Sequence, residues 1–466
     1  MIANLQPYPE YKELALPWLG RLPSHWGLRR NGGLFLQRNE TDFPDLPILE
    51  VAIKSGVKVR DLENGARKQV MTDRRKYKRA LCGDIAYNMM RMWQGATGRV
   101  PVDGLVSPAY VVARPLSGTE SRYFELLFRT PTYQSEVNNA SRGIVSDRNR
   151  LYWPDFKQLF SPLPPPEEQS AIVRFLDYAN GRLERAIRSK RKVIALLHEQ
   201  KQAIIHRAVT RGIDPTVPLK PTGIPWLGDI PTHWEVMPVK RACSLIRDGT
   251  HLPPPRTATG FPLLSVRNII NGRLVRRPDD SLVSKENFDK LNASFVVRPN
   301  DVLMAIVGAT LGKVAVVEDI GPFQIQRSVA IFRPRPAILA HDFFATFLRS
   351  PRLQQHLWQS VAFSAQPGIY LGFVANIPVP VPPTTVEQVS ICERLKEEVS
   401  PVNTAINHLE REISLLREYR TRLVADVVTG KLDVRTAARH LPAESLVPED
   451  AVPEEFTEPE LEEIEA

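Results

Sequence analysis

The residues best suited to chemistry in this chain are cations that could neutralise phosphates. Between Lys54 and Arg79 there are ten lysines or arginines and three acids, and Tyr77 lies among them. Lysine and arginine side chains bind phosphate oxygens, and such contacts supply much of a protein's affinity for nucleic acid. A charge run is also typical of an ordinary solvated face. We therefore keep two interpretations open for this basic cluster, a phosphate-contacting surface and a plain exposed surface.

Two polar loops carry side chains that could read bases. The segment 141–146 contains Arg142, the segment 364–369 contains Gln366, and each also contains a glycine. Arginine pairs bidentately with guanine and glutamine with adenine, while glycine lets the backbone approach a ligand closely. An ordinary turn before the proline that follows each loop is the alternative interpretation. The candidate DNA-contacting residues of the whole chain are Lys54, Arg74, Arg75, Lys76, Lys78, Arg79, Arg99, Arg142, Arg148, Arg256, Arg267, Asn268, Lys313, Arg327 and Gln366.

Residue patterns for catalysis are weak. The segment Gly308–Lys313 superficially resembles a phosphate-binding loop, but its glycines are one residue too close, and Val314 stands where a magnesium-binding Ser or Thr is needed. Asp155 and Lys157 provide the Asp-x-Lys part of a nuclease site without a convincing partner acid upstream. The sequence contains neither a methyltransferase Asn/Asp-Pro-Pro-aromatic loop nor a glycine-rich cofactor motif. We therefore expect no catalytic residues, no metal site and no cofactor in this chain.

Length and charge predict several domains and an anionic partner. The 466 residues exceed what a single core usually holds. The formal charge is +9, and residues 441–466 contain ten acids and no Lys or Arg, so the remaining body carries +19. A basic body favours nucleic acid as the partner. The acidic segment holds too little apolar surface to fold and is expected to be disordered.

Cysteine usage and hydropathy bound the compartment. Cys82, Cys243 and Cys392 lie far apart and form no Cys-x-x-Cys motif, which indicates a reducing compartment and no zinc knuckle. No apolar run approaches the 18 residues of a membrane-spanning helix. We expect a cytoplasmic protein without a membrane partner.

The chain contains two copies of one plan, a feature that should be sought before any other. A motif that reads Trp-Leu-Gly, a short gap, then Pro-Ser/Thr-His-Trp occupies residues 18–26 and returns 208 residues later at 226–234. A Glu-Gln pair at 168–169 opens a long helical pattern, and another at 387–388 opens a second, 219 residues later. The ends of the copies match and the middles diverge. This predicts like partners at the ends and two different targets in the middles, with the motif histidines packed in turns.

The divergent middles are predicted to share a mixed α/β fold. In the first, residues 47–53 and 57–62 are strand candidates, and Asn64-Gly65 is a hairpin turn signal. Related strand–turn units then occur in both copies, at 83–87 with 95–100 and at 300–304 with 308–314.

Two long heptad patterns predict a coiled coil. Each begins after a proline cluster and runs for roughly 40 residues, or about 60 Å of helix. Asn180, Lys190 and Lys201 are polar members of the first seam and can fix its register. The seam positions are Leu176, Asn180, Leu183, Ile187, Lys190, Ile194, Leu197, Lys201, Ile204 and Ala208 in the first pattern, and Leu395, Val399, Val402, Ile406, Leu409, Ile413, Leu416, Arg420, Leu423 and Val427 in the second.

The charges of the two patterns favour their pairing with each other. Residues 167–211 contain ten basic and five acidic side chains, whereas residues 387–431 contain seven basic and eight acidic ones. Halves related by a pseudo-two-fold axis would pair these helices antiparallel.

Taken together, the motifs resemble those of the specificity subunits of type I restriction–modification enzymes. The resemblance rests on the repeated Trp-Leu-Gly and Pro-Ser/Thr-His-Trp motif and on the Pro-Pro-Pro-Glu-Glu-Gln run at 164–169, and it covers about residues 15–433. It implies two DNA target-recognition domains, each followed by a long helix, in a non-catalytic subunit that reads a split, asymmetric site in double-stranded DNA. It also implies two methyltransferase subunits that bind S-adenosylmethionine and methylate adenine, and restriction–translocase subunits that use ATP and Mg²⁺, as docking partners.

We therefore predict an α+β chain with a pseudo-two-fold internal repeat and two mixed α/β target-recognition domains separated by an antiparallel coiled coil. One alternative is a DNA methyltransferase or nuclease component with its own active site, and another is a coiled-coil structural protein that does not bind DNA. The predicted segments are 1–160 (first motif and target-recognition domain), 161–211 (first spacer helix), 212–376 (second motif and target-recognition domain), 377–433 (second spacer helix) and 434–466 (acidic disordered tail).

Overall fold

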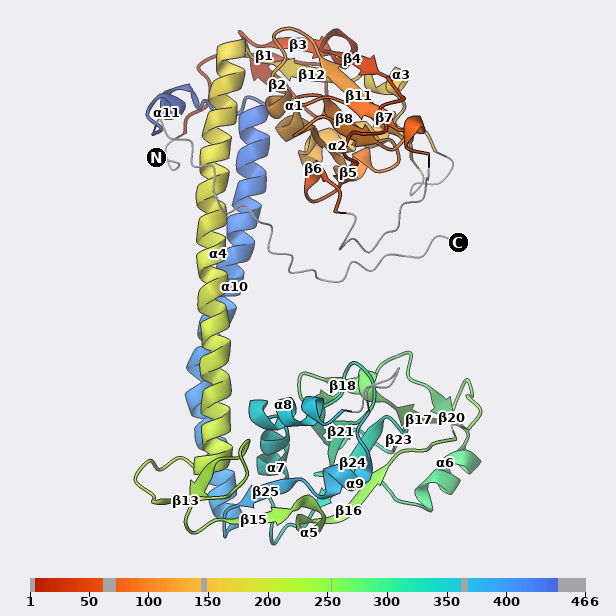
Figure 1. The fold of residues 1–466 in the computed structure, drawn as a ribbon, viewed down its shortest axis with the longest axis vertical. Coiled ribbons are helices and arrows are strands. Elements are labelled where there is room, and N and C mark those ends of the chain that lie inside the picture. Colours follow the sequence, from red (N-terminus) through yellow and green to blue (C-terminus); the bar gives the residue numbers. More distant parts are fainter. Residues whose placement is uncertain (1–4, 62–72, 144–148, 253, 362–367, 443–466) are drawn as a thin grey trace. The chain divides into compact units, whose positions relative to one another are not determined.

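The structure is a computed structural model of the chain. It describes residues 5–61, 73–143, 149–252, 254–361 and 368–442. The expected turn at Asn64-Gly65 and most of the acidic segment lie outside these residues. The chain divides into two compact units (Figure 1): unit 1 combines residues up to 190 with those from 411 onward, and unit 2 comprises residues 191–410.

Unit 1 is built from short strands and helices, one end of each long helix, and a small C-terminal helix. Its elements in chain order are β1 (Tyr11–Glu13), β2 (Arg21–Pro23), β3 (Gly27–Arg30), η1 (Asn31–Gly33), β4 (Phe35–Arg38), β5 (Leu49–Ala52), β6 (Gly56–Val59), η2 (Arg74–Lys76), β7 (Lys78–Ala80), β8 (Ile85–Asn88), η3 (Met92–Gln94), β9 (Thr97–Arg99), β10 (Gly104–Val106), β11 (Tyr110–Pro115), α1 (Ser121–Phe128), α2 (Pro131–Ala140), α3 (Trp153–Phe156), β12 (Phe160–Leu163), the start of α4 (Pro166–Arg211), the end of α10 (Thr385–Val428) and α11 (Arg435–Arg439).

A four-stranded antiparallel sheet in the order β4-β11-β8-β9 lies at the centre of unit 1. Successive side chains of a strand point to opposite faces. Val111 and Ala113 of β11 therefore join the core that contains α1 and α2, while Val112 joins a second core beneath the β5–β6 hairpin. The two predicted strands at 47–53 and 57–62 are confirmed as β5 and β6, which pair with each other directly.

The first copy of the repeated motif packs against the end of the second long helix. Trp26 is fully buried. Gly430, just after α10, adopts φ +76°, and a Cβ there would lie 3.1 Å from Trp26 Cζ3 and 2.5 Å from Pro23 Cδ. Tyr123 Oη donates to the carbonyl of Val428 at 2.9 Å. The N-terminal motif is thus completed by the C-terminal part of the chain, which explains why both ends belong to unit 1.

Unit 2 is built from the middle of the chain. Its elements in chain order are the end of α4, β13 (Leu219–Pro221), β14 (Asp229–Pro231), β15 (Glu235–Pro238), α5 (Val239–Ala242), β16 (Cys243–Asp248), β17 (Phe261–Leu264), η5 (Val266–Asn268), β18 (Ile269–Ile270), β19 (Arg273–Leu274), β20 (Leu282–Val283), α6 (Lys285–Asn292), β21 (Val302–Ala305), β22 (Val314–Val316), β23 (Gln324–Ile325), β24 (Val329–Pro334), α7 (His341–Leu348), α8 (Pro351–Gln359), α9 (Leu371–Ala375), β25 (Pro378–Val381) and the start of α10.

Unit 2 repeats the sheet of unit 1 and enlarges it. Its six strands have the order β16-β24-β21-β22-β19-β18. β21 and β22 are antiparallel neighbours, as β8 and β9 are in unit 1, so the prediction of related strand–turn units is confirmed. The segment Gly308–Lys313 is the turn between β21 and β22, and a strand follows it. A phosphate-binding loop instead opens a helix, so this segment lacks that geometry.

The second copy of the motif packs against the end of the first long helix. Trp234 is fully buried. Gly212, just after α4, adopts φ +74°, and a Cβ there would lie 3.4 Å from Trp234 Cζ2. Each motif therefore seats its second tryptophan on the glycine that ends a long helix, and in both units the helix belongs to the other copy of the repeat.

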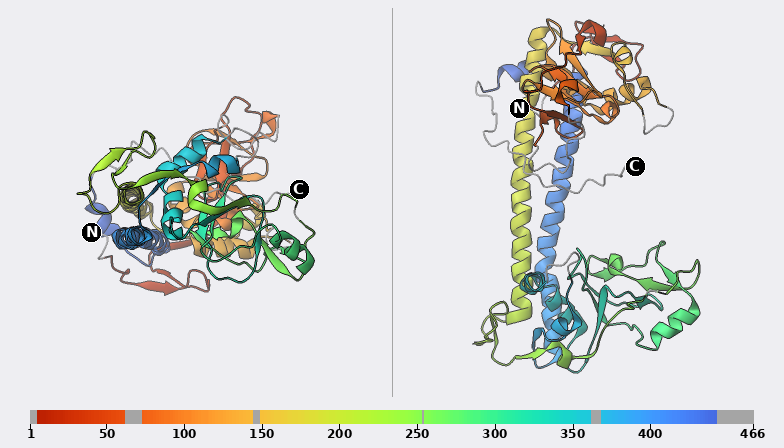
Figure 2. Two further views of the ribbon diagram at one scale, coloured as in Figure 1. Left: turned by 90° about the horizontal axis from the view of Figure 1, so that it is seen from below. Right: turned by 45° about the vertical axis from the view of Figure 1, so that its right-hand side comes forward.

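Within unit 1, and again within unit 2, the long helices α4 and α10 contact each other (Figures 1 and 2). In unit 1, Arg420 pairs with Glu184 at 3.1 Å and Lys190 with Glu412. In unit 2, Lys201 Nζ donates to Asn403 Oδ1 at 2.7 Å, and Arg207 pairs with Glu398 at 2.8 Å. Residue numbers rise along one helix as they fall along the other, so the helices are antiparallel within each unit. Every predicted seam position is buried or half-buried.

The end of the described chain is ordered further than expected. Helix α11 follows residue 433, where the sequence analysis placed the start of the acidic tail. Val434 and Ala438 are buried in the unit 1 core, and Arg174 donates to the carbonyl of Ala438. The predicted start of the disordered tail at residue 434 is therefore too early, because apolar contacts hold α11 in the unit 1 core. The acidic composition further along the chain hid these contacts from the sequence analysis. Among the described residues, no helix is long and apolar enough to cross a membrane.

Candidate nucleic-acid interface

In unit 1 residues 74–79 of the basic cluster lie at one end of the central sheet. The backbone N–H of Arg79 donates to the carbonyl of Glu40, two residues beyond β4, at 2.8 Å. Lys78 Nζ donates to the carbonyl of Tyr110, the first residue of β11, at 2.8 Å. β4 and β8 are both antiparallel to β11, so the ends of β4 and β8 meet the start of β11. We call this end of the sheet the reading edge of unit 1.

The loop that contains Arg142 returns to the same edge. The backbone N–H of Leu151 donates to the carbonyl of Met89, directly after β8, at 2.9 Å. Arg142 and Arg150 form an antiparallel bridge at the base of the loop. The structure therefore brings together the cluster at 74–79 and the predicted base-reading loop, which are separate in sequence. Arg148 lies outside the described residues.

Several of the predicted cations in unit 1 have internal partners. Arg79 pairs with Glu40 at 3.2 Å and lies 4.4 Å over the ring of Phe43. Arg74 donates to the carbonyl of Leu46 at 2.8 Å. Burial lowers the pKa of Lys78, and its ammonium donates a hydrogen bond to the Tyr110 carbonyl. These three side chains are therefore tied into the scaffold of the reading edge.

The other candidate cations of unit 1 face solvent. Arg75 is exposed and pairs only with the exposed Asp73, at 3.2 Å, an arrangement that contributes little to stability. Arg142 is exposed and pairs with Asp155. The side chains of Lys54, Lys76 and Arg99 are also exposed. These five can reach phosphates without breaking a buried contact.

Unit 2 has an equivalent reading edge, where β16 and β21 end and β24 and β22 begin. Thr250 bridges to Gln326, and the backbone N–H of Arg327 donates to the Thr250 carbonyl at 3.2 Å. The N–H of Ile306, just after β21, donates to the Ser328 carbonyl at 2.9 Å. Arg327 therefore lies at this edge.

The second predicted base-reading loop also returns to the reading edge of unit 2. Gly368 bridges to Val307, and the N–H of Ile369 donates to the carbonyl of Ile306 at 2.9 Å. Lys313, directly before β22, lies at this edge with Arg327, and both side chains are exposed. Gln366 lies outside the described residues.

Two other candidates of unit 2 have structural roles. Asn268 is 1% exposed, and its amide nitrogen donates to the carbonyl of Val275 and to Asp280 at 3.0 and 2.7 Å. It also completes a capping box with Ser265. Arg267 pairs with Asp279 at 2.8 Å. Asn268 therefore cannot reach a base in this conformation. Its amide is used to cap the turn at Val266–Asn268. Arg256 is exposed.

The described part of the chain contains no cluster of three His, Cys, Asp or Glu side chains that could hold a metal ion. Asp155, of the partial nuclease motif, pairs with Arg142. The motif histidines each contact the acid of a Glu-Gln pair: His25 Nε2 lies 2.8 Å from Glu168, and His233 Nε2 lies 3.0 Å from Glu387. These histidines lie where a turn packs on a helix start.

The glutamine of each Glu-Gln pair has a role that sequence reasoning missed. Gln169 is buried, accepts from the N–H of Glu120 at 2.9 Å and donates to the carbonyls of Gly118 and Pro164 at 3.1 and 2.8 Å. Gln388 repeats this pattern with the N–H of Ala340 and the carbonyls of Ile338 and Pro382. Each glutamine thus clamps the loop before α1 or α7 to the start of a long helix. The sequence signal for this role was the recurrence of the Glu-Gln pair after prolines in both copies.

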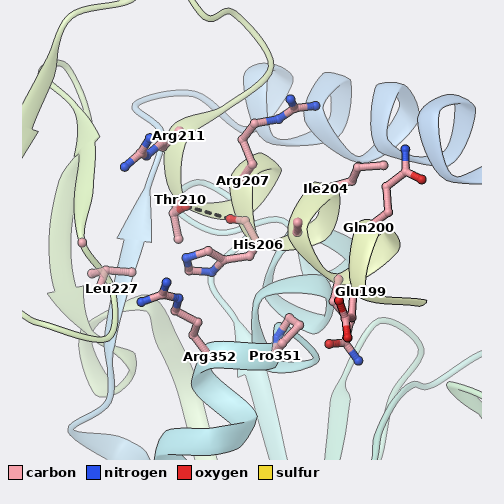
Figure 3. A pocket seen from close by; sticks show the side chains of 13 residues that line it. Glu199, Gln200, Ile204, His206, Arg207, Thr210, Arg211, Leu227, Pro351 and Arg352 are labelled. Atoms are coloured by element: carbon pink, nitrogen blue, oxygen red, sulfur yellow. Dashed lines mark hydrogen bonds between the residues drawn. The ribbon is translucent and has the colours of Figure 1, made fainter. Parts of the chain in front are cut away.

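Unit 2 also contains a cavity of ≈ 740 Å³ beside α4 (Figure 3). Leu227 and Gly228 of the repeated motif, Pro351 and Arg352 of α8, and residues 199–211 of α4 line it. Burial, and then the charges of Arg352 and Arg211, lower the pKa of His206. The cavity is therefore a positively charged recess, formed by elements other than those of the reading edge.

Comparisons with known proteins agree with this architecture. The chain is 25% identical over 334 residues to the type I restriction enzyme EcoBI specificity subunit of Escherichia coli, covering 69% of this chain and 68% of that protein. It is 24% identical over 462 residues to the putative type I restriction enzyme MjaX specificity subunit of Methanocaldococcus jannaschii, covering 94% of this chain and 100% of that protein. The chain is homologous to type I specificity subunits. No family model matches it.

The fold has the same relatives. A solved chain from a study of complex assembly and conformational transition in a type I restriction–modification system matches with a TM-score of 0.65 and 18% identity, over 88% of this chain and 99% of that one. The resemblance to type I specificity subunits that the repeated motifs predicted is thus confirmed.

Proposed function

We propose that this protein is the DNA-specificity subunit of a type I restriction–modification complex, and that it has no active site of its own. Unit 1 and unit 2 each contain one target-recognition domain, and each domain reads one half of a split, asymmetric site. The two long helices form an antiparallel coiled coil that separates the domains. Homology to specificity subunits along most of the chain supports this function.

The observation that carries the proposal is the pair of equivalent reading edges. Both units direct a loop back to the end of the central strand, through Leu151 to Met89 in one and Ile369 to Ile306 in the other. The exposed cations at these edges come from different elements, η2 in unit 1 and the turns before β22 and β24 in unit 2. A shared scaffold with different surface side chains suits two readers of different sequences, since bases are distinguished by side chains in the grooves.

Replacing one reading surface tests this proposal. A chain in which residues 27–160 are exchanged for the equivalent region of a homologue should recognise a site altered in one half only. Mapping of methylated sites in a host that carries the complete system measures the change. The reciprocal exchange of the region between the second motif and α10 is the matched control, and it should alter the other half. A change in both halves after one exchange would contradict the model of two independent readers.

We further propose that the repeated motifs and the long helices dock two methyltransferase subunits, and that restriction–translocase subunits complete the complex. S-adenosylmethionine, ATP and Mg²⁺ would be bound by those partners. Calorimetric titration of the purified chain with S-adenosylmethionine should therefore give no binding heat. Binding by the isolated chain would favour the alternative of a methyltransferase component.

A further inference from the structure

Each reading edge carries a tyrosine at an equivalent place in the chain. Tyr370 follows Ile369 at the reading edge of unit 2, and Tyr152 follows Leu151 at the reading edge of unit 1. Both precede a short helix as its N-cap residue, with φ and ψ of −77° and 147° for Tyr370 and −80° and 158° for Tyr152. The two tyrosines therefore have the same backbone conformation at equivalent places in the two units.

Neither tyrosine side chain caps the helix that follows it. Ser, Thr, Asp and Asn are preferred at an N-cap because their side chains accept a backbone N–H bond, and neither tyrosine makes such a bond. The side chain of Tyr370 is 82% exposed, and it has no hydrogen bond or ring contact within the described part of the chain. A residue that breaks a local rule at the same point of two copies is expected to serve function rather than folding.

The surroundings of Tyr370 suit nucleic acid. The exposed cations Lys313 and Arg327 lie at the same edge. Leu252, which is 88% exposed, follows Thr250 there. Cations that hold a backbone beside aromatic and apolar side chains that contact bases are the combination by which proteins stack on bases or wedge between base steps.

We propose that Tyr370 stacks on a base of the half-site read by unit 2, and that Tyr152 makes the corresponding contact for unit 1. This inference rests on the proposed function, because it needs the reading edges to face DNA. It assigns a base contact to one residue in each unit, and it makes that contact aromatic rather than hydrogen-bonded. Tyr152 is 39% exposed, so it should lose less contact area than Tyr370 when it is truncated.

The test compares variants of the full chain on a duplex that the parent chain selects from a random library. Tyr370→Ala should weaken specific binding by about 5- to 150-fold, the loss expected for one stacked base. Tyr370→Phe should bind within about twofold of the parent, because the ring is retained. The slope of log affinity against log salt should stay unchanged in both, because no phosphate contact is removed. Tyr419→Ala, which alters an exposed tyrosine of α10, is the control and should bind like the parent.

Three results would overturn the inference. Parental affinity of Tyr370→Ala would remove the contact altogether. A Tyr370→Phe variant as weak as Tyr370→Ala would assign the effect to the hydroxyl, and a shallower salt slope would assign it to a phosphate. If the parent itself selects no duplex, the proposed function fails first and this inference fails with it. If the parent binds its selected duplex and Tyr370→Ala binds it equally tightly, only the proposed tyrosine contact is contradicted.

Discussion

At the residue scale, the same motif produces different hydrogen bonds in its two copies. In unit 2, Glu387 accepts from Trp234 Nε1 at 2.8 Å. In unit 1 the equivalent acid, Glu168, accepts from Tyr8 Oη at 2.5 Å, and Trp26 Nε1 has no partner among the described residues. Burial, and then the bond to Glu168, raise the pKa of Tyr8. The motif letters alone predicted one packed turn, and the difference arises from the segment that precedes the first copy.

The cavity histidine His206 should make unit 2 sensitive to mild acid. Its pKa in the folded chain lies below the ordinary value of 6.5, because burial and the nearby Arg352 and Arg211 disfavour the charged ring. The unfolded chain therefore binds this proton more readily. The resulting stability is fully present above about pH 6.5 and is lost as the pH falls from there toward the folded pKa.

Replacing His206 by Gln should flatten this part of the pH dependence. Thermal unfolding of parent and variant between about pH 7.5 and about pH 5.5 measures the effect, since the histidine proton is exchanged in that range. The matched control is His198→Gln, because His198 is exposed on the same helix of the same unit. It should leave the profile close to that of the parent. An identical fall in stability for the parent and His206→Gln would exclude His206 as its source.

At the element scale, the long helices were predictable because their periodicity is regular and their apolar rows are long. The heptads of the two patterns gave positions that are all buried or half-buried in α4 and α10. Polar seam residues were also anticipated, although not their partners: Lys190 reaches Glu412, and Lys201 reaches Asn403. Pro401 lies inside α10, where it removes one backbone hydrogen bond. Tertiary contacts along the seam override that local cost.

Two leucines of α10 test how much the seam stabilises the protein. Leu423 is 3% exposed within the unit 1 core, whereas Leu415 is 56% exposed on the same helix. Leu423→Ala should lower the stability of unit 1 by about 2–5 kcal/mol because it leaves a cavity, and Leu415→Ala should change it by less than about 0.5 kcal/mol. Calorimetric melting of both variants measures the difference. Equal melting curves for the two variants would argue that the seam at Leu423 does not pack as described.

The short elements were harder to predict than the helices. Strands such as β18, β19 and β20 contain two residues each, so no alternation of apolar and polar residues can reveal them. The reading edges were likewise hidden, because they assemble residues such as Arg79, Leu151 and Met89 through backbone contacts distant in sequence. Of the predicted DNA contacts, Asn268 is buried and caps a turn, which the sequence alone does not reveal.

At the scale of the whole molecule, the repeat does not fold as two consecutive halves. Gly430 receives Trp26, and Gly212 receives Trp234, so each unit combines segments from both copies of the plan. The sequence revealed the two copies but not this exchange. Each motif also contacts the helix of its own copy, through His25 to Glu168 and His233 to Glu387, and nothing in the motif shows that its second tryptophan meets the other helix. An antiparallel arrangement of the helices requires the exchange, since the end of each helix then lies beside the start of the other.

The length of the helix pair should set the gap between the two half-sites, if the helices form the proposed coiled coil. Inserting one heptad after Lys190 of α4 and one after Glu410 of α10 keeps the seam in register, because the apolar rows repeat every seven residues. It lengthens the pair by about 10 Å at about 1.5 Å per residue. Base pairs are spaced about 3.4 Å apart along the duplex, so the recognised gap should grow by about three base pairs. The bases read in each half should not change, because neither reading edge is altered.

Methylation-site mapping of the double-insertion variant beside the parent measures the gap directly. The matched control inserts two residues at the same two points. Two residues rotate the apolar rows out of the seam, so this control should lose activity rather than acquire a new gap. Methylation by the double-heptad variant at the parental spacing would show that something other than the helices determines the distance between the half-sites. A lengthened gap with unchanged half-sites would instead separate the two roles physically, with base choice at the reading edges and spacing in α4 and α10.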